Sequence, residues 1–442
     1  MFVGALRGRG SVRGAALVLS VATLCAVACG PTPGSDARPN LVLIIGDDHG
    51  YPDFGFMGSP HVRTPSLDRL AREGIHFPYG FATESYCLPS QRSLLTGLHP
   101  HQWDLRVQRL REAGVDRGDD EWMAEFRTLP GLLAEHGYAS FQGGKLWEAS
   151  YELAGFGDGM VRGGVPHGSC RRGGLGRESI APVIDFIDDH RDAPFFLWFA
   201  PCLPHTPHDS PGEYTELYAS MDLSPKARAY YASISRFDDR VGELLSHLDA
   251  RGLSDRTLVV YVSDNGWDQG PHAPGPDDSG DGPKGKKSLY ELGFRTPILF
   301  HWPGQVPANA VNEALVSTID LFPTFLDFAG LVSPGDRPGI SLKPVLEGSG
   351  DWPRREVIGA RGARQSPTRR VQGAPMMTRA FFLRSRDWHY IVYPDIKRQE
   401  LYDLRVDPRE DHNVAGANRE RIREFRARIA AWREKMEAPG AP

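Results

Sequence analysis

The chain has 442 residues, which is enough for one large domain, an appendage and an ample hydrophobic core. Its 51 basic and 56 acidic side chains are mixed along the chain and leave a net charge of -5, so it lacks the basic excess typical of nucleic-acid-binding proteins. Glycine (49) and proline (36) are enriched, which argues against a simple helical bundle and favours a scaffold with many loops.

The amino terminus has the pattern of a secretory signal. Three arginines precede an apolar run over residues 15–28, which is too short and too rich in small side chains to span a bilayer comfortably. We therefore expect a signal peptide over residues 1–28 and an exported protein that is periplasmic or at the cell surface.

Two outcomes are open where this signal ends. One is ordinary cleavage after Ala28, and the other is attachment of a lipid to Cys29, as in bacterial lipoproteins. Residues 29–38 would then form a tether, and the lipid would anchor the chain to a membrane. In an exported protein Cys170 and Cys202 can form a disulfide, although either can equally be a buried thiol.

The mature fold opens with a continuous apolar run over residues 40–45, followed by Asp47 and Asp48. Runs that are apolar on both faces are typical of central strands in parallel sheets, and open α/β sheets bind ligands at the carboxyl ends of such strands. Paired carboxylates repel each other unless a cation lies between them. The pair therefore predicts either a metal site with oxygen ligands or a polar turn with a capping Asp.

A thiol stands ahead of a predicted helix later in the chain. Residues 64–74 first predict a capped helix that ends at a glycine, with a short strand over 75–77. Cys87 then precedes a helix that Pro89 can initiate, because proline is tolerated in the first turn. The unpaired N–H groups and the dipole at such a helix start suit an oxyanion such as sulfate or phosphate. Cys87 is therefore a candidate nucleophile or nucleophile precursor, or else a small buried apolar residue.

The sequence Cys-Leu-Pro-Ser at 87–90, with Leu-Leu-Thr-Gly at 94–97, resembles the signature of the type I sulfatases, a formylglycine-dependent family of the alkaline phosphatase superfamily. The resemblance implies that a formylglycine-generating enzyme oxidises Cys87 to formylglycine, whose hydrated aldehyde attacks a sulfate ester. The family places an arginine that guides maturation and braces the formylglycine two residues after the proline. Here that position is Gln91, and the arginine follows as Arg92, which is the candidate for a catalytic role.

After a predicted helix over residues 129–136 and a short strand, a Gly-Lys-x-Trp sequence resembles the family's Gly-Lys-x-His element. In that element the Lys and the His contact the formylglycine oxygens, so the resemblance assigns Lys145 to this role. Trp147 occupies the position of the histidine, which is the usual group for deprotonating the sulfated intermediate. Glu148 or a histidine of the loop over 98–101 is the candidate replacement.

A third apolar strand is predicted over residues 194–200, after a helix over 179–190, and it leads into Pro-His-Thr-Pro. This resembles the Pro-His-x-Pro element of sulfatases, whose histidine holds the sulfate and protonates the departing alcohol. A histidine titrates near neutral pH, and one at the carboxyl end of a strand can reach a leaving oxygen. His205 is therefore either the general acid or a structural residue of the loop.

An amphipathic core helix is predicted over residues 230–248, and a buried strand over 257–262 ends in Asp264 and Asn265. Two strands that deliver Asp-Asp and Asp-Asn to one sheet edge would supply four oxygen-bearing side chains, which suit Ca²⁺ or Mg²⁺ better than zinc. The resemblance gives the same metal ligands: Asp47, Asp48, Asp264 and Asn265.

The sequence Lys-Lys-Ser-Leu-Tyr-Glu over 286–291 resembles the family's Lys-x-x-x-Tyr-Glu element. The resemblance implies that Lys286 binds the sulfate oxygens, whereas we expect the adjacent Lys287 to be solvated. Another core strand within 295–304 and a helix over 317–331 follow.

From about residue 351 the chain changes to Arg-rich loops with three predicted elements: strands over 380–384 and 388–393, and a closing helix over 418–436. This part resembles the small carboxyl-terminal subdomain of sulfatases, a short antiparallel sheet with one helix. We therefore expect a catalytic domain over 39–350, with a mixed, mostly parallel sheet sandwiched by helices as in alkaline phosphatase, and a carboxyl-terminal subdomain over 351–442.

The expected function is hydrolysis of a sulfate monoester of a small molecule or carbohydrate. The divalent metal, Lys145 and Lys286 would stabilise charge on the sulfuryl oxygens, and His205 would protonate the leaving alcohol. Substrate specificity would lie in three irregular loops, over 101–125, 155–176 and 267–285.

Two alternatives stay open. The same scaffold serves phosphonate and phosphodiester hydrolases, and nothing in the sequence separates these from a sulfatase. The chain can also be a degenerate sulfatase that binds sulfated glycans without turnover, which Gln91 and Trp147 favour and the intact Asp-Asp and Asp-Asn sets disfavour.

Overall fold

The strand predicted over residues 40–45 lies at the centre of the main sheet. In the computed structural model it is β1 (Asn40–Gly46), and all of its residues are buried. The structure describes residues 38–161, 174–267, 284–361, 380–394 and 397–438, and Arg38–Pro442 forms one unit. Within these ranges the main sheet has eight strands in the order β5-β4-β6-β1-β7-β8-β2-β9. Besides β1 they are β2 (Ile75–Phe77), β4 (Ala139–Gly144), β5 (Asp158–Gly159), β6 (Phe195–Ala200), β7 (Thr257–Ser263), β8 (Ile298–His301) and β9 (Ala310–Val311).

The central strands of this sheet run in one direction. β1 pairs in parallel with β6 on one side and with β7 on the other, and β4 pairs in parallel with β6. β8 is antiparallel to β7, and β2 is antiparallel to β8. The predicted mixed, mostly parallel sheet is therefore confirmed. Because β4, β6, β1 and β7 are parallel neighbours, their carboxyl ends meet along one edge, where open α/β sheets bind ligands.

Helices cover both faces of the sheet, as predicted. Side chains alternate along β1, so that Leu41, Leu43 and Ile45 enter one hydrophobic cluster while Val42 and Ile44 enter the other. The first cluster includes residues of α2 (Cys87–Thr96), α3 (Pro100–Glu112), α4 (Leu129–Ala134), α9 (Leu321–Phe328) and α10 (Lys343–Leu346). The second includes residues of α1 (Pro65–Glu73), α5 (Ala181–Asp189) and α7 (Pro225–Ala250).

The remaining short elements connect these layers. A two-stranded parallel pair joins β3 to β10. Their bounds are β3 (Gly80–Phe81), β10 (Val316–Ser317), α6 (Gly212–Glu216), α8 (Glu291–Phe294), and the 3₁₀ helices η1 (Gly55–Met57), η2 (Trp122–Glu125), η3 (Ser254–Arg256) and η4 (Thr318–Asp320). Among the described residues, no helix is both long enough and apolar enough to cross a membrane.

The prediction of an irregular loop over 101–125 is wrong, because α3 occupies residues 100–112. Pro100 stands in its first turn, and His99 and Gln102 form a capping box. Only part of the helix is buried, and most of its other positions are polar, so hydrophobic periodicity is weak there. The helix predicted over 317–331 is also shorter than expected, since a 3₁₀ turn precedes α9.

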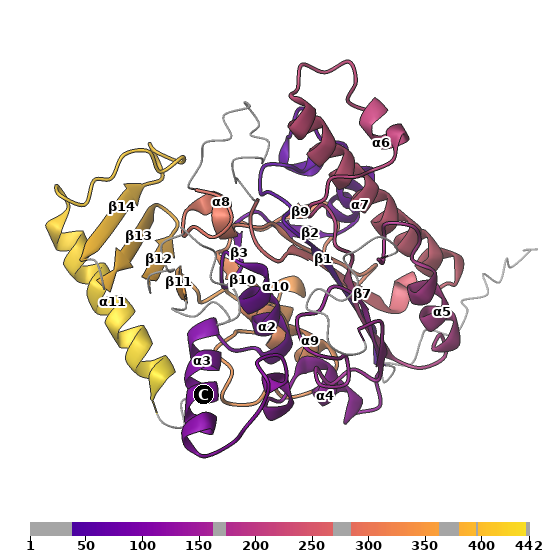
Figure 1. The fold of residues 1–442 in the computed structure, drawn as a ribbon, viewed down its shortest axis with the longest axis horizontal. Helices are drawn as coiled ribbons and strands as arrows, with labels where there is room; N and C mark the ends of the chain where they lie inside the picture. Colours follow the sequence, from indigo (N-terminus) through magenta and orange to yellow (C-terminus); the bar gives the residue numbers. More distant parts are fainter. Residues whose placement is uncertain (1–37, 162–173, 268–283, 362–379, 395–396, 439–442) are drawn as a thin grey trace, which may run out of the picture. The chain divides into compact units, whose positions relative to one another are not determined.

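The carboxyl-terminal part forms a second sheet, and the predicted short antiparallel sheet with one helix is confirmed. Its four strands within the described ranges are β11 (Glu356–Arg361), β12 (Ala380–Ser385), β13 (Trp388–Tyr393) and β14 (Arg398–Asp403), paired in that order. The helix α11 (Arg419–Glu437) packs on one face through Ile422, Phe425 and Ile429 (Figure 1). The other face packs against Phe81 and Phe294, so the segments predicted as 39–350 and 351–442 share a hydrophobic interface.

Candidate active site

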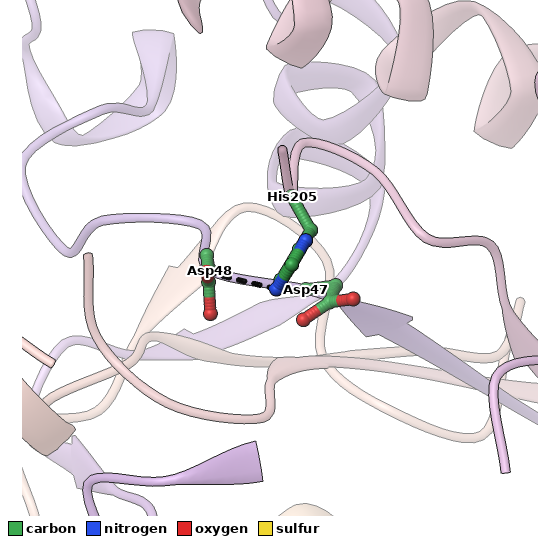
Figure 2. Close-up of side chains that lie close together, drawn as sticks. All are labelled: Asp47, Asp48 and His205. Atoms are coloured by element: carbon green, nitrogen blue, oxygen red, sulfur yellow. Dashed lines mark ion pairs between the residues drawn. The ribbon is translucent and has the colours of Figure 1, made fainter. Parts of the chain in front are cut away.

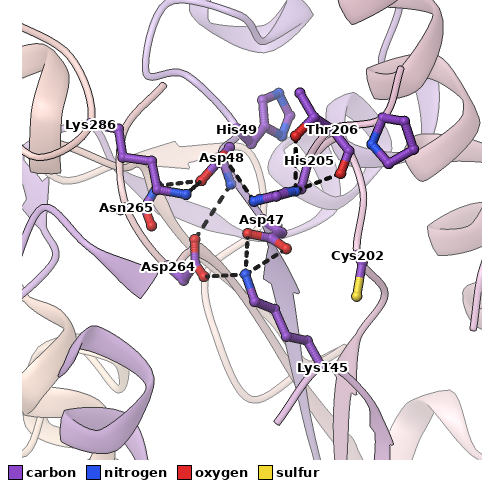
Figure 3. A network of polar contacts seen from close by, with 12 residues as sticks. Asp47, Asp48, His49, Lys145, Cys202, His205, Thr206, Asp264, Asn265 and Lys286 are labelled. Atoms are coloured by element: carbon purple, nitrogen blue, oxygen red, sulfur yellow. Dashed lines mark hydrogen bonds and ion pairs between the residues drawn. The ribbon is translucent and has the colours of Figure 1, made fainter. Parts of the chain in front are cut away.

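The parallel strands deliver the predicted site residues to one edge of the sheet. Lys145 follows β4 directly, and His205 lies in the loop that leaves β6. The ends of β1 and β7 are aligned, because Gly46 pairs with Ser263. This register places the four oxygen-bearing residues beside one another, as Figure 3 shows: Asp47, Asp48, Asp264 and Asn265.

All four residues are buried, and Asp48 contacts both Asp264 and Asn265 directly. The backbone N–H of Asp48 donates to Asp264 Oδ1 at 3.4 Å, and Asn265 Nδ2 donates to Asp48 Oδ1 at 2.8 Å. Asp48 adopts a φ of 65°, in the left-handed region that few residues other than glycine occupy. Strained backbone of this kind concentrates at functional sites. Burial raises the pKa of Asp264 above its usual range. The neighbouring Asp47 carboxylate adds to this rise by charge repulsion.

Two buried lysines face these carboxylates. Lys145 Nζ donates to Asp47 Oδ1 at 2.7 Å and to Oδ2 at 2.8 Å, and it lies 3.9 Å from Asp264 Oδ2. Lys286 Nζ donates to Asp48 Oδ1. Burial alone would lower the pKa of both lysines, but the carboxylates outweigh it and raise both values, with Asp47 dominant for Lys145 and Asp48 for Lys286. Both ammonium groups therefore stay charged at neutral pH.

A glycine makes the position of Lys145 possible. Gly144 has a φ of 95°, and a Cβ there would lie 2.2 Å from the carbonyl oxygen of Ala200. Only glycine allows this close approach of β4 to β6. The next backbone N–H, that of Lys145, then donates to Ala200 O at 2.7 Å, so the lysine leaves the strand at a defined point.

Cys87 is the first residue of α2, and its side chain is buried. The helix thus begins two residues before Pro89, which fits in the first turn because its missing N–H would have no intrahelical partner there. Burial raises the pKa of the Cys87 thiol to about 11, while Lys145 and Lys286 oppose this rise. The thiol therefore lies within electrostatic reach of both lysines, yet unmodified it would be a poor nucleophile at neutral pH.

His205 faces the carboxylates from the loop after β6. Its Nδ1 donates to the carbonyl oxygen of Thr206 at 2.7 Å, which leaves Nε2 directed at Asp48 Oδ2, 3.6 Å away (Figure 2). The side chain keeps 24% exposure, so solvent or substrate can reach it. This position suits a proton donor, and the same atom can also serve as a metal ligand.

The residues present fit a divalent cation. Candidate ligand atoms of Asp47, Asp48 and His205 lie within 4.8 Å of one another. Asn265 Oδ1 is buried and has no hydrogen-bond partner in the described part of the chain. Carboxylates with an amide oxygen are the donors that Ca²⁺ and Mg²⁺ prefer. The sequence had assigned His205 only to proton transfer, so its place in this group is a result of the structure.

The two residues after Ser90 face different partners. Gln91 Nε2 donates to Asp264 Oδ2 at 2.8 Å. Arg92 instead forms a buried ion pair with Glu148, at 2.8 Å to Oε1 and 3.2 Å to Oε2, and its guanidinium lies 4.0 Å from the centre of the Trp103 ring. Of the two, only Gln91 bonds to the carboxylate cluster. The catalytic role of Arg92 stays a prediction. The ion pair between Arg92 and Glu148 does not favour that role.

The candidate replacements for the missing histidine are engaged elsewhere. Glu148 is paired with Arg92, and the rings of His99 and His101 lie 5.1 and 4.7 Å from the ring of Trp432 on α11. Trp147 itself is buried, with its ring 5.3 Å from Lys145 Nζ.

One further histidine was passed over in the sequence. His208 interacts electrostatically with Asp48 and His205; burial lowers its pKa and Asp48 partly offsets this. Its place in the sequence His-Thr-Pro-His, after a strand, was the available signal.

Of the two cysteines considered for a disulfide, Cys202 is disulfide-bonded, and Cys170 lies outside the described residues.

Comparisons with known proteins agree with this geometry. The sulfatase family model matches residues 39–331, and a model described as N-sulphoglucosamine sulphohydrolase, C-terminal, matches residues 282–435. The N-acetylgalactosamine-6-sulfatase of Canis lupus familiaris is 32% identical over 78% of this chain and 72% of that protein. The N-acetylglucosamine-6-O-sulfatase of Bacteroides thetaiotaomicron is 25% identical over 90% of this chain and 87% of that protein.

In fold, the chain is similar to the phosphonate monoester hydrolase of Agrobacterium radiobacter. The TM-score is 0.67 at 20% identity, over 90% of this chain and 95% of that one. At this identity the likeness concerns the fold alone. The family match covers more than half of the sequence, and the curated relatives are aligned over most of it. This chain therefore belongs to the sulfatase family, within the alkaline phosphatase superfamily, and is a sulfatase enzyme.

Proposed function

We propose that this enzyme hydrolyses a sulfate monoester of a carbohydrate, using a formylglycine derived from Cys87 and a divalent cation held by Asp47, Asp48, Asp264 and Asn265. The observation that supports this most is the meeting of Cys87, two lysines and three carboxylates at one sheet edge. The carbohydrate is inferred from two relatives, which are named for 6-sulfates of N-acetylgalactosamine and N-acetylglucosamine.

Each charged residue has a role that follows from its contacts. When bound, the cation supplies positive charge that polarises the sulfuryl group. Lys145 and Lys286 are held by carboxylates, so they are oriented before substrate arrives and can stabilise charge on the sulfuryl oxygens without rearranging. His205 donates a proton from Nε2 to the leaving alcohol oxygen, while the bond from Nδ1 to Thr206 O keeps its ring in place. The converted side chain of Cys87 supplies the nucleophile.

The first test is the chemical state of Cys87. The full chain is coexpressed with a formylglycine-generating enzyme, and mass spectrometry of the Cys87 peptide is expected to show replacement of sulfur by an aldehyde oxygen. Sulfate release from an aryl sulfate and from 6-sulfated N-acetylhexosamine is then measured beside the Cys87→Ala variant, which is expected to release none.

The outcomes separate the proposal from its alternatives. An intact thiol with no sulfate release, but with retained binding of sulfated glycan, identifies a degenerate sulfatase. Faster hydrolysis of an aryl phosphonate or phosphodiester than of the aryl sulfate identifies the other hydrolase class. Sulfate release that persists in the Cys87→Ala variant would remove Cys87 from the mechanism.

A further inference from the structure

Gln91 is buried beside the carboxylate cluster, which consists of Asp47, Asp48 and Asp264. It follows Cys87 by four residues on α2, which places both side chains on the same face of the helix. The Gln91 side chain is 2% exposed, and its Nε2 donates to Asp264 Oδ2 at 2.8 Å. A neutral amide therefore contacts one of the three carboxylates directly.

The oxygen of this amide has no hydrogen-bond partner in the part of the chain that the structure describes. Gln91 Oε1 is buried without a hydrogen bond within the described residues, and the same is true of Asn265 Oδ1. A buried acceptor without a hydrogen-bond partner destabilises the fold. The neighbouring carboxylates cannot donate to these oxygens when ionised, because they carry no proton. A hard cation is a partner that both oxygens can accept.

The charges of the cluster favour the same partner. Asp47, Asp48 and Asp264 bring three negative charges, and Lys145 and Lys286 bring two positive ones. Glutamine at position 91 is neutral and leaves this remaining negative charge in place, and a negative charge attracts a cation. The adjacent Arg92 does not neutralise this remaining negative charge, because its own charge is already paired with Glu148.

We propose that Gln91 is part of the cation site: its Nε2 holds Asp264 in position, and its Oε1 serves as an additional oxygen ligand for a divalent cation. The inference rests on the proposed function only for the presence of that cation. It gives Gln91 a binding and positioning role at the metal, separate from any role at Cys87.

The test measures cation affinity and does not depend on turnover. The full chain, stripped with chelator, is titrated with Ca²⁺ and with Mg²⁺ by calorimetry. Gln91→Met keeps the side-chain volume but removes both polar atoms, and we expect it to weaken the Kd about 10–100-fold, as loss of a ligand or its support does. Gln91→Glu is expected to bind at least as tightly as the wild type.

A matched control comes from another buried glutamine. Gln102 accepts from the backbone N–H of His99 at the start of α3, and Gln102→Met removes the same two polar atoms from a buried site outside the cluster. It is expected to keep the wild-type Kd. Thermal unfolding without cation checks that all variants are folded.

Each outcome decides the inference. Equal Kd values for wild type and Gln91→Met would overturn it, and so would a wild type that binds neither cation. A Gln91→Met variant that loses sulfate release but keeps its Kd would place Gln91 at Cys87 instead. A weakened Kd in Gln91→Met supports the inference even if the wild type releases no sulfate, in which case only the proposed function fails.

Discussion

Adjacent residues with identical side chains have opposite surroundings at this site. Lys286 is buried, and its Nζ bonds to Asp48, whereas Lys287 is exposed. The backbone turns sharply between them, since Lys287 has a φ of 73°. One lysine therefore neutralises a buried carboxylate, while its neighbour is solvated, as the sequence predicted.

This contrast supplies a matched pair of variants. Lys286→Met is expected to lower kcat/KM for an aryl sulfate by about 10²–10³-fold, the usual effect of removing one preorganised group that stabilises transition-state charge. Lys287→Met is expected to stay near the wild-type value. Steady-state kinetics at saturating Ca²⁺ make the measurement, and similar losses in both variants would show that Lys286 has no special role.

At the scale of elements, the carboxyl-terminal sheet supports the segment that bears Lys286. Lys284 Nζ donates to Arg409 O and Glu410 O, both at 2.9 Å. Seven residues after Lys284, Glu291 pairs with Arg384 of β12, and its backbone N–H donates to Glu410 Oε2 at 2.7 Å. The carboxyl-terminal part of the chain thus contacts this segment on both sides of Lys286.

The buried pair of Glu291 and Arg384 predicts a particular acid sensitivity. Burial alone would raise the pKa of Glu291, but Arg384 and then Arg295 outweigh it and lower the value from 4.5 to about 2. A lowered native pKa stabilises the fold above pH 4.5, and this contribution is lost as the pH falls toward 2. Glu291→Gln should therefore be less stable than the wild type at pH 7, by at most about 3 kcal/mol.

Urea unfolding at several pH values measures this difference. It should shrink between pH 4.5 and 2, where the wild type loses the contribution of its ionised carboxylate. Glu73→Gln, which removes a partly exposed partner of Arg69, is the control and should change stability by less than about 1 kcal/mol. A constant difference for Glu291→Gln across the range would refute this account of the pair.

At the scale of the whole molecule, residues 1–37 lie outside the described part of the chain, so export and lipid attachment stay proposals. The basic and apolar pattern before Ala28 supports export, and Cys29 at the cleavage point supports a lipid anchor. An exported sulfatase tethered to a membrane would act on sulfated carbohydrates outside the cytoplasm.

Fractionation of bacterial cells that express the full chain tests this proposal. We expect the protein in the membrane fraction and expect Cys29→Ser to release it, because the lipid attaches to that thiol. Cys25→Ser changes the other cysteine of the apolar run and should leave the protein at the membrane. A wild type found wholly in the soluble fraction would leave ordinary cleavage as the outcome.

Much of the architecture was predictable because it depends on local pattern. Apolar runs over 40–45 and 257–262 must be buried on both faces, which places them in the centre of a sheet and their polar ends at one edge. The strands β11 and β14 were missed in the sequence for the opposite reason. They are the two edges of their sheet and carry charged residues, so only their pairing with neighbours identifies them.

The residues of the candidate site differ in the same way: some were predictable from local motifs, and others depend on tertiary contacts. Motifs indicated which carboxylates, lysines and histidine belong to the candidate site, but not which partners Gln91 and Arg92 contact. Successive side chains leave a helix about 100° apart, so these two neighbours point to different parts of the fold. Gln91 meets Asp264, 173 residues away, and Arg92 meets Glu148, 56 residues away. Contacts over such separations exist only once the strands and α2 have packed together.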